Sequence, residues 1–436
     1  MVSKSYFKVQ IFCFKMMGIL MEDIDWNRFT SRAYAIYSFL LLSCFIYLFI
    51  ITEAIDLILK WGDLDNMTFN LCYLVTHFAG LCKIAVIMHQ KSKIRTFYQS
   101  LESGYFLPNH ERGGNEEFRI ISSAIWQSNM QTYVFYTFVT VIVANRGFYA
   151  GFDKGYFIQF TSVNGSETTN KHYKVMPYTT WIPFDTNVSP YYEIAFAYQI
   201  VSALIYGLLI GTCDSFIAGF MVHIKAQLLI LKNSFGNYIY AAKVKTQVKN
   251  DFENLSFLKN CSDNGLKTNK DIKNLNPETL IYVQRYLRDC IIHHQQTIKL
   301  VEIVESEFNY LMLIQFLGSL LLLCLSLFQL SINDIRSTRF FSMICFAGLM
   351  LFQLLIFCWN GNEVLVESLE IAFAAYGSDW FLCDLATQKA LVLVIQKAQR
   401  ALQLSAGKFA YLTLETYMNI LRASGSYYMV LRKVNE

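Results

Sequence analysis

The chain has 436 residues, of which 54% are hydrophobic and only 16% are charged, and its mean hydropathy is +0.32. Because about a quarter of the residues in a soluble globular protein are charged, this composition excludes that class and indicates a polytopic membrane protein. The net charge of +4 is modest and comes without a basic block, which argues against a nucleic-acid partner.

Seven apolar segments approach the length that a helix needs to cross a bilayer, about 20 residues. They cover residues 34–51, 69–88, 130–148, 191–212, 308–330, 340–359 and 409–431. The first and third are the weakest, and the last contains Glu415 and Arg422, whose charges would have to face protein or water. The predicted fold class is therefore an all-α membrane protein with seven transmembrane helices.

Residues 1–33 precede the first span and combine Phe7, Phe12 and Phe14 with several lysines. Lys15 interrupts the apolar run and no small-residue cleavage site follows, so a signal peptide is not predicted. We expect instead a cytosolic amphipathic helix that lies at the inner face of the membrane and contacts lipid.

The distribution of Lys and Arg predicts the orientation of the spans. The N-terminal segment and the second, fourth and sixth loops hold 25 of these residues, against 7 on the other side of the membrane. The N-terminus is therefore predicted to be cytosolic and the C-terminus extracellular. Asn66, Asn164 and Asn187 begin sequons in the loops placed outside and are candidate glycosylation sites, although two further triplets in the fourth loop must be chance. The 11 cysteines lie in spans or cytosolic loops, so no disulfide framework is expected.

Further helices are predicted in the cytosol. The fourth loop, residues 213–307, is expected to continue the fourth span as a helix, to pass through a linker and to begin a second helix at Pro277. Apolar residues repeat at helical spacing on that second helix and again in residues 379–400. Such stripes need a protein partner, so we expect an anchor between subunits. The stripe residues expected at this interface are Leu287, Ile291, Leu385 and Leu393.

The sequence offers no constellation for catalysis. It contains no Cys-x-x-Cys, no His-Glu-x-x-His and no Walker loop, and no catalytic triad can be argued from it. His293 and His294 stand side by side on a predicted helix, where a packing or solvated role is favoured over a metal site. The protein is not predicted to be an enzyme, and no cofactor or metal is expected.

Residues 398–409, Ala-Gln-Arg-Ala-Leu-Gln-Leu-Ser-Ala-Gly-Lys-Phe, and residues 426–431, Ser-Tyr-Tyr-Met-Val-Leu, resemble the C-terminal signature of insect odorant receptors. The match is specific in this stretch, and elsewhere it is an agreement in hydropathy and loop lengths. The resemblance implies a subunit of a tetrameric, odorant-gated cation channel in the plasma membrane of a sensory-neuron dendrite. Its partners would be a small volatile odorant, membrane lipid and subunits of the shared odorant receptor co-receptor.

On this basis the chain divides into six parts. They are a cytosolic N-terminal segment (1–33), transmembrane helices 1–4 that bind the ligand (34–212), a cytosolic loop with anchor helices (213–307), transmembrane helices 5 and 6 (308–359), a cytosolic anchor helix (360–407) and the pore-lining helix 7 (408–436).

A pocket for a volatile ligand should be apolar and aromatic, because such a ligand offers dispersion and about one hydrogen bond. The resemblance places this pocket in the outer half of the bundle. The residues expected to line it are Tyr73, Thr76 and His77 in the second span, Val141, Ala144 and Phe148 in the third, Ile194 and Tyr198 in the fourth, and Phe341 and Cys345 in the sixth.

One face of the last span carries small or polar residues. The resemblance places the hydrophobic constriction of the pore at Val430 and Val434, where a ring of apolar side chains can block ions by excluding water. Asn419, Ala423 and Ser426 would line the path below that constriction.

Three alternatives remain open. The first alternative is the co-receptor, but the chain is short for it, and residues 285–301 lack the Trp and the basic run expected there. For a G-protein-coupled chemoreceptor the charge bias is inverted, and neither Asp-Arg-Tyr nor Asn-Pro-x-x-Tyr occurs. A gustatory-type homomeric channel of the same superfamily typically ends in Gln-Phe, which is absent here. The odorant-binding subunit is the preferred interpretation.

Overall fold

The computed structural model describes residues 5–19, 28–110, 112–152, 155–161, 168–258 and 275–435. The α-helices in this part of the chain are α1 (Lys8–Met16), α2 (Phe29–Leu42), α3 (Leu48–Leu59), α4 (Leu64–His89), α5 (Lys91–Leu101), α6 (Gly114–Phe152), α7 (Tyr191–Leu258), α8 (Pro277–Ile332), α9 (Thr338–Tyr376), α10 (Leu385–Ala398) and α11 (Leu414–Asn435). A π-helical turn, Ser43–Tyr47, joins α2 to α3 without a break. The prediction of a helical membrane fold is confirmed in this coarse form.

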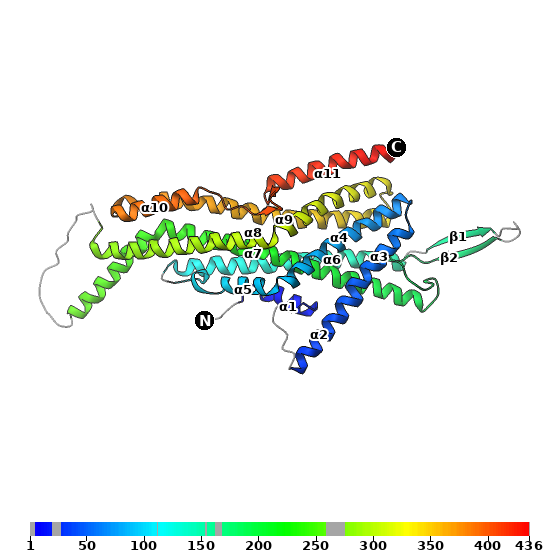
Figure 1. Ribbon diagram of the computed structural model, residues 1–436, viewed down its shortest axis with the longest axis horizontal. Coiled ribbons are helices and arrows are strands. Elements are labelled where there is room, and N and C mark those ends of the chain that lie inside the picture. The colour runs from blue at the N-terminus through cyan, green and yellow to red at the C-terminus, as the bar shows by residue number, and fades with distance from the viewer. Residues whose placement is uncertain are drawn as a thin grey trace.

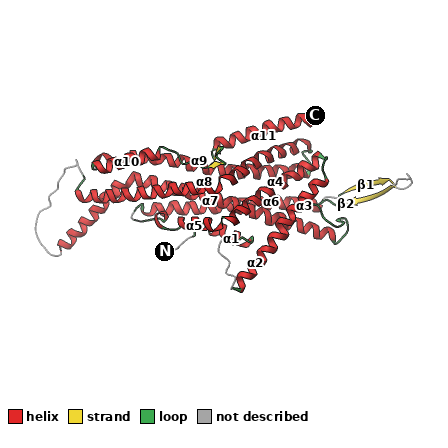
Figure 2. Ribbon diagram, in the orientation of Figure 1, coloured by secondary structure: helices red, strands yellow, loops and turns green. Residues whose placement is uncertain are grey.

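Two antiparallel hairpins interrupt the helices (Figure 2). β1 (Tyr156–Thr161) pairs with β2 (Thr168–Tyr173) between α6 and α7, and this hairpin projects from one end of the molecule in Figure 1. β3 (Ser405–Ala406) pairs with β4 (Ala410–Tyr411) just before α11. Neither hairpin was expected from the sequence. β1 and β2 lie in a segment that was assigned to a loop, and β3 and β4 are short and lie in segments that were assigned to helices.

Three very long helices form the axis of the molecule (Figure 1). α7 has 68 residues and α8 has 56, so at about 1.5 Å per residue each is far longer than a bilayer is thick. α7, α8 and α9 pack against one another along this axis. α8 begins at Pro277, which suits the first position of a helix because proline lacks an N–H donor, and it continues unbroken through the predicted fifth span. The predicted fourth and fifth spans and the helices expected beside them in the cytosol are therefore continuous in α7 and α8.

Five helical segments in the described residues are long and apolar enough to cross a membrane. They are Phe29–Leu59, Leu64–His89, Tyr191–Asn250, Pro277–Ile332 and Arg339–Tyr376. The predicted third and seventh spans lie in α6 and α11, which do not meet this criterion of length and hydropathy. The number of seven spans and their orientation therefore stay predictions.

The start of the last helix was predicted wrongly. It begins at Leu414 rather than at residue 409, because residues 405–411 form the β3–β4 hairpin. The turn places Gly407 at a φ of 62°, where glycine is favoured, and a Cβ atom there would lie 2.5 Å from a side-chain carbon of Leu313. α9 continues past residue 360 to Tyr376, so the boundary placed there between membrane and cytosol falls within a helix and stays a prediction.

The N-terminal helix α1, which was expected at the inner face of the membrane, packs against the protein core. α1 packs against α6 and α7, and Phe7 and Phe14 are fully buried. The Phe7 ring lies 5.2 Å and the Phe14 ring 5.3 Å from the ring of Phe216 on α7. Gln10 on the same helix is buried and donates hydrogen bonds to α6. One side of this helix therefore belongs to the protein core, while Phe12 and Met16 are exposed, and its expected place at the inner face of the membrane stays a prediction.

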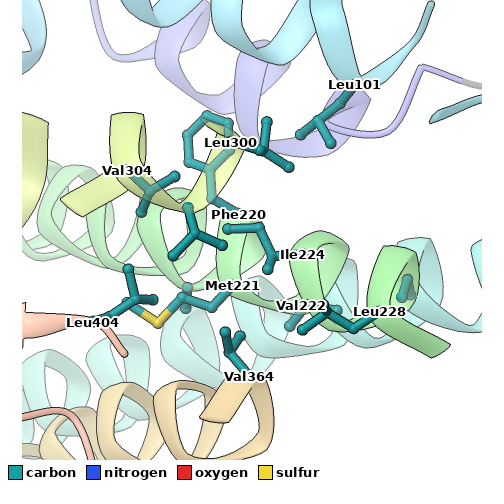
Figure 3. Close-up of a cluster of buried hydrophobic side chains, with 14 of the residues drawn as sticks. Leu101, Phe220, Met221, Val222, Ile224, Leu228, Leu300, Val304, Val364 and Leu404 are labelled. Carbon is teal, nitrogen blue, oxygen red and sulfur yellow. The ribbon is translucent and has the colours of Figure 1, made fainter. Parts of the chain in front are cut away.

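The largest apolar core surrounds the middle of α7 (Figure 3). Phe220, Met221 and Ile224 of α7 point into it, and the segments around them supply the other side chains. The remaining labelled contributors are Val222 and Leu228 of α7, Leu101 of α5, Leu300 and Val304 of α8, Val364 of α9 and Leu404 before β3. α7 is thus the helix that most other elements share.

Two histidines in the part of α8 that precedes the predicted fifth span are buried. His293 Nε2 lies 2.9 Å from Gln227 Oε1, and burial lowers the pKa of His293 well below its usual range. Burial, with the charge of Lys397 nearby, lowers the pKa of His294 to about 4. No group of three metal-ligating side chains occurs among the described residues, so the pair packs as neutral rings.

We expect acidification to destabilise this part of the protein. The unfolded chain binds protons at these histidines below about pH 6.5 while the folded chain does not, so stability is present above that pH and is lost as the pH falls. Each histidine should cost about 1.4 kcal/mol per pH unit in this window. The melting temperature of purified protein at pH 7 and pH 5.5 measures the loss, and His293→Gln/His294→Gln should reduce it. His110→Gln, on the surface, is the matched control; an equal effect of both variants would contradict the assignment.

Candidate functional site

A cavity lies between α4, α6, α7 and α9, in the half of the molecule that carries the apolar spans. Its volume, counted as the space open to the centre of a water molecule, is about 70 Å³. It is lined by Tyr73, Thr76 and His77 of α4, by Phe135, Val139, Ile142 and Val143 of α6, by Tyr178 of the loop before α7, by Ala203, Gly207, Ile210, Gly211 and Asp214 of α7, and by Phe346, Leu349, Met350 and Gln353 of α9. Most of these side chains are apolar or aromatic.

Two glycines of α7 bring α6 close to the cavity. A Cβ atom at Gly207 would lie 2.6 Å from a methyl carbon of Val139, and one at Gly211 would lie 3.3 Å from Phe135 Cβ. Glycines four residues apart on a helix let a neighbouring helix approach closely. The small-residue pair therefore serves packing between α6 and α7, and it also shapes the wall of the cavity.

Aromatic rings close one end of the cavity. The ring of Tyr73 lies 5.5 Å from those of Phe69 and Tyr178 and 5.2 Å from that of Phe346. The backbone N–H of Tyr178 donates to Gln199 Oε1, and Gln199 Nε2 donates to the Tyr178 carbonyl, both at 3.0 Å. These two hydrogen bonds fix the loop before α7 as a cover over the rings.

His77 is held at the side of the cavity by a buried carboxylate. Its Nδ1 lies 2.6 Å from Glu53 Oε2, and both side chains are buried. Its ring packs edge-to-face on Phe49 and on Tyr206, whose hydroxyl donates to the His77 carbonyl. The position of the imidazole is therefore set by α3 and α7.

A buried ion pair forms the other end. Lys83 Nζ lies 2.5 Å from Asp214 Oδ1, and the two residues are 1% and 0% exposed. Gln353 Nε2 donates to Asp214 Oδ2, while Gln353 Oε1 accepts from Gln315 Nε2 at 2.9 Å. The network joins α4, α7, α8 and α9. A second, smaller cavity of about 10 Å³ shares Thr76, Ile210, Met350 and Gln353 with the first and reaches Lys83.

Only part of the predicted ligand set lines this cavity. Tyr73, Thr76 and His77 do. The others do not: Val141, Ala144, Phe148, Ile194 and Phe341 are exposed on the outside of the bundle, and Tyr198 and Cys345 are half-buried away from the cavity. In α6 the lining face belongs to Ile142 and Val143, and in α9 to Phe346. One residue along a helix is a rotation of about 100°, so these predicted residues and the cavity lie on different faces of the helices, and their role in binding stays a prediction.

Sequence reasoning missed Lys83 and Asp214. A signal existed, because an ionisable residue within an apolar span marks a polar interior site. Lys83 lies inside the predicted second span, and Asp214 lies two residues beyond the predicted end of the fourth. Their pairing could not be deduced, since 131 positions separate them.

The residues predicted to line the pore lie on the outside of the protomer. Asn419, Ser426 and Val430 of α11 are exposed, and Ala423 is half-buried. An open groove runs past Asn419 and Ala423 to Phe409, which is 87% exposed. The side chain of Val434 lies outside the described residues.

The predicted interface residues divide into two groups. Leu385 and Leu393 of α10 are each 65% exposed and have an apolar surface available to a partner. Leu287 is 3% exposed within the protomer and Ile291 is half-buried, so α8 directs these residues to the chain's own core.

The candidate glycosylation sites have different surroundings. Asn66 is half-buried, and its amide donates to Asp63 Oδ2 at 2.7 Å. The amide of Asn187 donates to Asp185 Oδ1 at 2.8 Å. Asn164 lies outside the described residues.

The chain resembles known proteins over nearly its whole length. It is 24% identical over 391 residues to odorant receptor Or2 of Anopheles gambiae, covering 88% of each chain, and 25% identical over 384 residues to odorant receptor 10 of Aedes albopictus, covering 87% of this chain and 88% of that one. Its fold matches the insect olfactory receptor OR5 of Machilis hrabei, solved in complex with eugenol, with a TM-score of 0.74 and 15% identity over 98% of both chains.

A sequence profile described as "7tm Odorant receptor" matches residues 63–425, which is most of the chain. The match includes the four helices that line the cavity and extends into α11. It agrees with the resemblance found in the C-terminal segment, and it identifies a receptor rather than an enzyme. The chain belongs to the insect odorant receptor family.

Proposed function

We propose that the protein is the odorant-binding subunit of an insect odorant-gated cation channel, and that the odorant binds in the cavity between α4, α6, α7 and α9. The observation that carries this proposal is the composition of the cavity wall, which is apolar and aromatic with a few fixed polar groups. Such a wall suits a small volatile molecule, since dispersion supplies affinity and a polar group supplies orientation. The structural relative solved with eugenol supports a small-molecule site in this fold.

We further propose seven membrane spans with the N-terminus in the cytosol. Five of the spans would be the helical segments that are long and apolar enough to cross a membrane, and α6 and α11 would be the other two. The excess of Lys and Arg in the N-terminal segment and in the second, fourth and sixth loops supports this orientation. The protein would lie in the plasma membrane of a sensory-neuron dendrite.

The channel would be a heterotetramer with the odorant receptor co-receptor. α11 presents Asn419, Ser426 and Val430 away from the protomer, as a helix that faces an axis shared with other subunits would. Leu385 and Leu393 on α10 would pack against a second subunit in the cytosol. The lack of Trp in residues 285–301 supports the odorant-binding role over that of the co-receptor.

Filling the cavity should weaken the response to odorants. Ala203 lines it, and Ala203→Leu would place three more carbon atoms in the space that a ligand occupies. Lost contact of a few methylenes corresponds to about 1–3 kcal/mol, so the half-maximal concentration of an activator should rise by about tenfold or more. Currents recorded from cells that also express the co-receptor measure this. Ala197→Leu, on the exposed face of the same helix, should leave the dose–response curve in place; an unchanged curve for Ala203→Leu would remove this cavity from the proposal.

A cysteine in place of Val430 tests whether this face of α11 lines the pore. Val430 is 59% exposed, so an externally applied thiol reagent should modify Val430→Cys and change the current if this face lines the ion path. Ser424→Cys is the control because Ser424 is buried on the opposite face of α11. If the reagent left the current through Val430→Cys unchanged in both the closed and the open channel, α11 would not line the pore with this face.

Charge on the exposed stripe of α10 should prevent assembly. Leu393→Asp would place an unpaired carboxylate in an apolar contact, which costs several kcal/mol. Co-purification with the co-receptor should be lost. Gln396→Asp adds the same charge at an exposed polar position of the helix and should retain it. Equal recovery of the co-receptor with both variants would exclude this stripe as the contact.

A further inference from the structure

Starting from the proposed odorant site, on which this inference rests, we propose that the receptor selects neutral ligands with a hydrogen-bond acceptor oxygen, a ketone, aldehyde or ester. The acceptor would lie at the Tyr73 hydroxyl, and the apolar remainder of the ligand would extend along α6 and α7. Tyr73 is then a specificity-determining residue as well as part of the aromatic wall.

Tyr73 has an unused hydrogen-bond donor. The residue is 5% exposed and lines the cavity, yet its hydroxyl oxygen has no hydrogen-bond partner among the described residues. Buried polar groups are nearly always hydrogen-bonded, because an unmade bond carries the full cost of desolvation. A phenylalanine would pack against Phe69, Tyr178 and Phe346 without that cost, so the hydroxyl needs a reason beyond packing.

Other polar groups of the wall already have partners. Thr76 donates to the Cys72 carbonyl at 2.9 Å, and His77 is bonded to Glu53. Asp214 accepts from Lys83 and Gln353, and the amide oxygen of Gln353 accepts from Gln315. Each of these groups already has a partner, whereas a ligand acceptor at Tyr73 would supply the first partner of its hydroxyl.

The surroundings of Tyr73 favour an oxygen with partial negative charge. The guanidinium carbon of Arg146 lies 5.0 Å from the centre of the Phe69 ring and 5.9 Å from that of Tyr73. Its positive potential favours the negative end of a carbonyl dipole and opposes an ammonium group. The charges of Lys83 and Asp214 cancel at the other end of the cavity, so the site as a whole suits a neutral ligand.

Matched ligand pairs test the proposal directly. Acetophenone with α-methylstyrene and 2-heptanone with 2-methyl-1-heptene differ by the replacement of a carbonyl oxygen with a methylene group. Binding to purified protein, measured by thermal shift, and current in cells with the co-receptor are recorded for both members of each pair. We expect the ketone to act at a lower concentration than its alkene, and Tyr73→Phe to reduce that preference by about three- to tenfold, the value of one neutral hydrogen bond. The potency of the alkene should not change.

Tyr198→Phe is the matched control, since its hydroxyl donates to the Cys44 carbonyl outside the cavity and the variant should keep the ketone preference. Equal potency of ketone and alkene in the unaltered protein would overturn the proposal, as would a Tyr73→Phe variant that weakens both members alike. Binding of the ketone without current would overturn the channel function and leave the selectivity standing. Absence of both binding and current for every compound would overturn both.

Discussion

The buried ion pair between Lys83 and Asp214 is the constraint on which the cavity depends. A charge in an apolar bundle is costly unless it is paired and hydrogen-bonded, and here the carboxylate receives both a lysine and the amide of Gln353. Removing one partner of such a pair typically costs about 3–5 kcal/mol, because the other charge remains buried. The pair links α4 to α7, and Gln353 with Gln315 extends the link to α9 and α8. Three of the four helices that line the cavity, α4, α7 and α9, are thereby fixed to one another at its polar end. The aromatic end is closed by the loop before α7.

The same polar end lies on the helix that holds the base of α11. Gln315 is six residues from Asn309 and ten from Glu305 on α8, which is about 9 and 15 Å along the helix axis. The Asn309 carbonyl accepts a hydrogen bond from the N–H of Gly407 at 2.9 Å, and Glu305 accepts from the N–H of Ser405 at 2.7 Å. The β3–β4 hairpin that leads into α11 is thus bonded to α8 by two contacts. One helix, α8, therefore connects the cavity to the segment proposed to line the pore.

Periodicity predicted the helices well and their orientation around the cavity poorly. The start of α8 at Pro277 was predictable because proline acts on the local backbone. The face of α6 that lines the cavity could not be predicted from hydrophobicity. Val141 and Ala144 on the outside are as apolar as Ile142 and Val143 on the inside. In a membrane both faces of a helix meet apolar surroundings, so hydrophobic periodicity carries little information about which side faces protein. Phe7 and Phe14 of the N-terminal segment show the same ambiguity, since both would suit lipid but pack on α7.

Ionisable residues carry the information that apolar residues lack. Glu53 pairs with His77, Lys83 pairs with Asp214, and Arg146 lies over the rings of Phe69 and Tyr178. Each of these charges sits in or beside an apolar span, and each borders the cavity or its aromatic cover. A charge cannot face lipid at this depth without a large cost, so its position on a helix fixes which side is interior. In a chain of this kind, the rotation of each span is better derived from its one or two charged residues than from its many apolar ones. Applied to α6, that reasoning predicts that the face with Arg146 is interior. Ile142 and Val143 lie one helical turn away on that face, so the charged residue indicates the cavity wall that hydrophobicity alone did not.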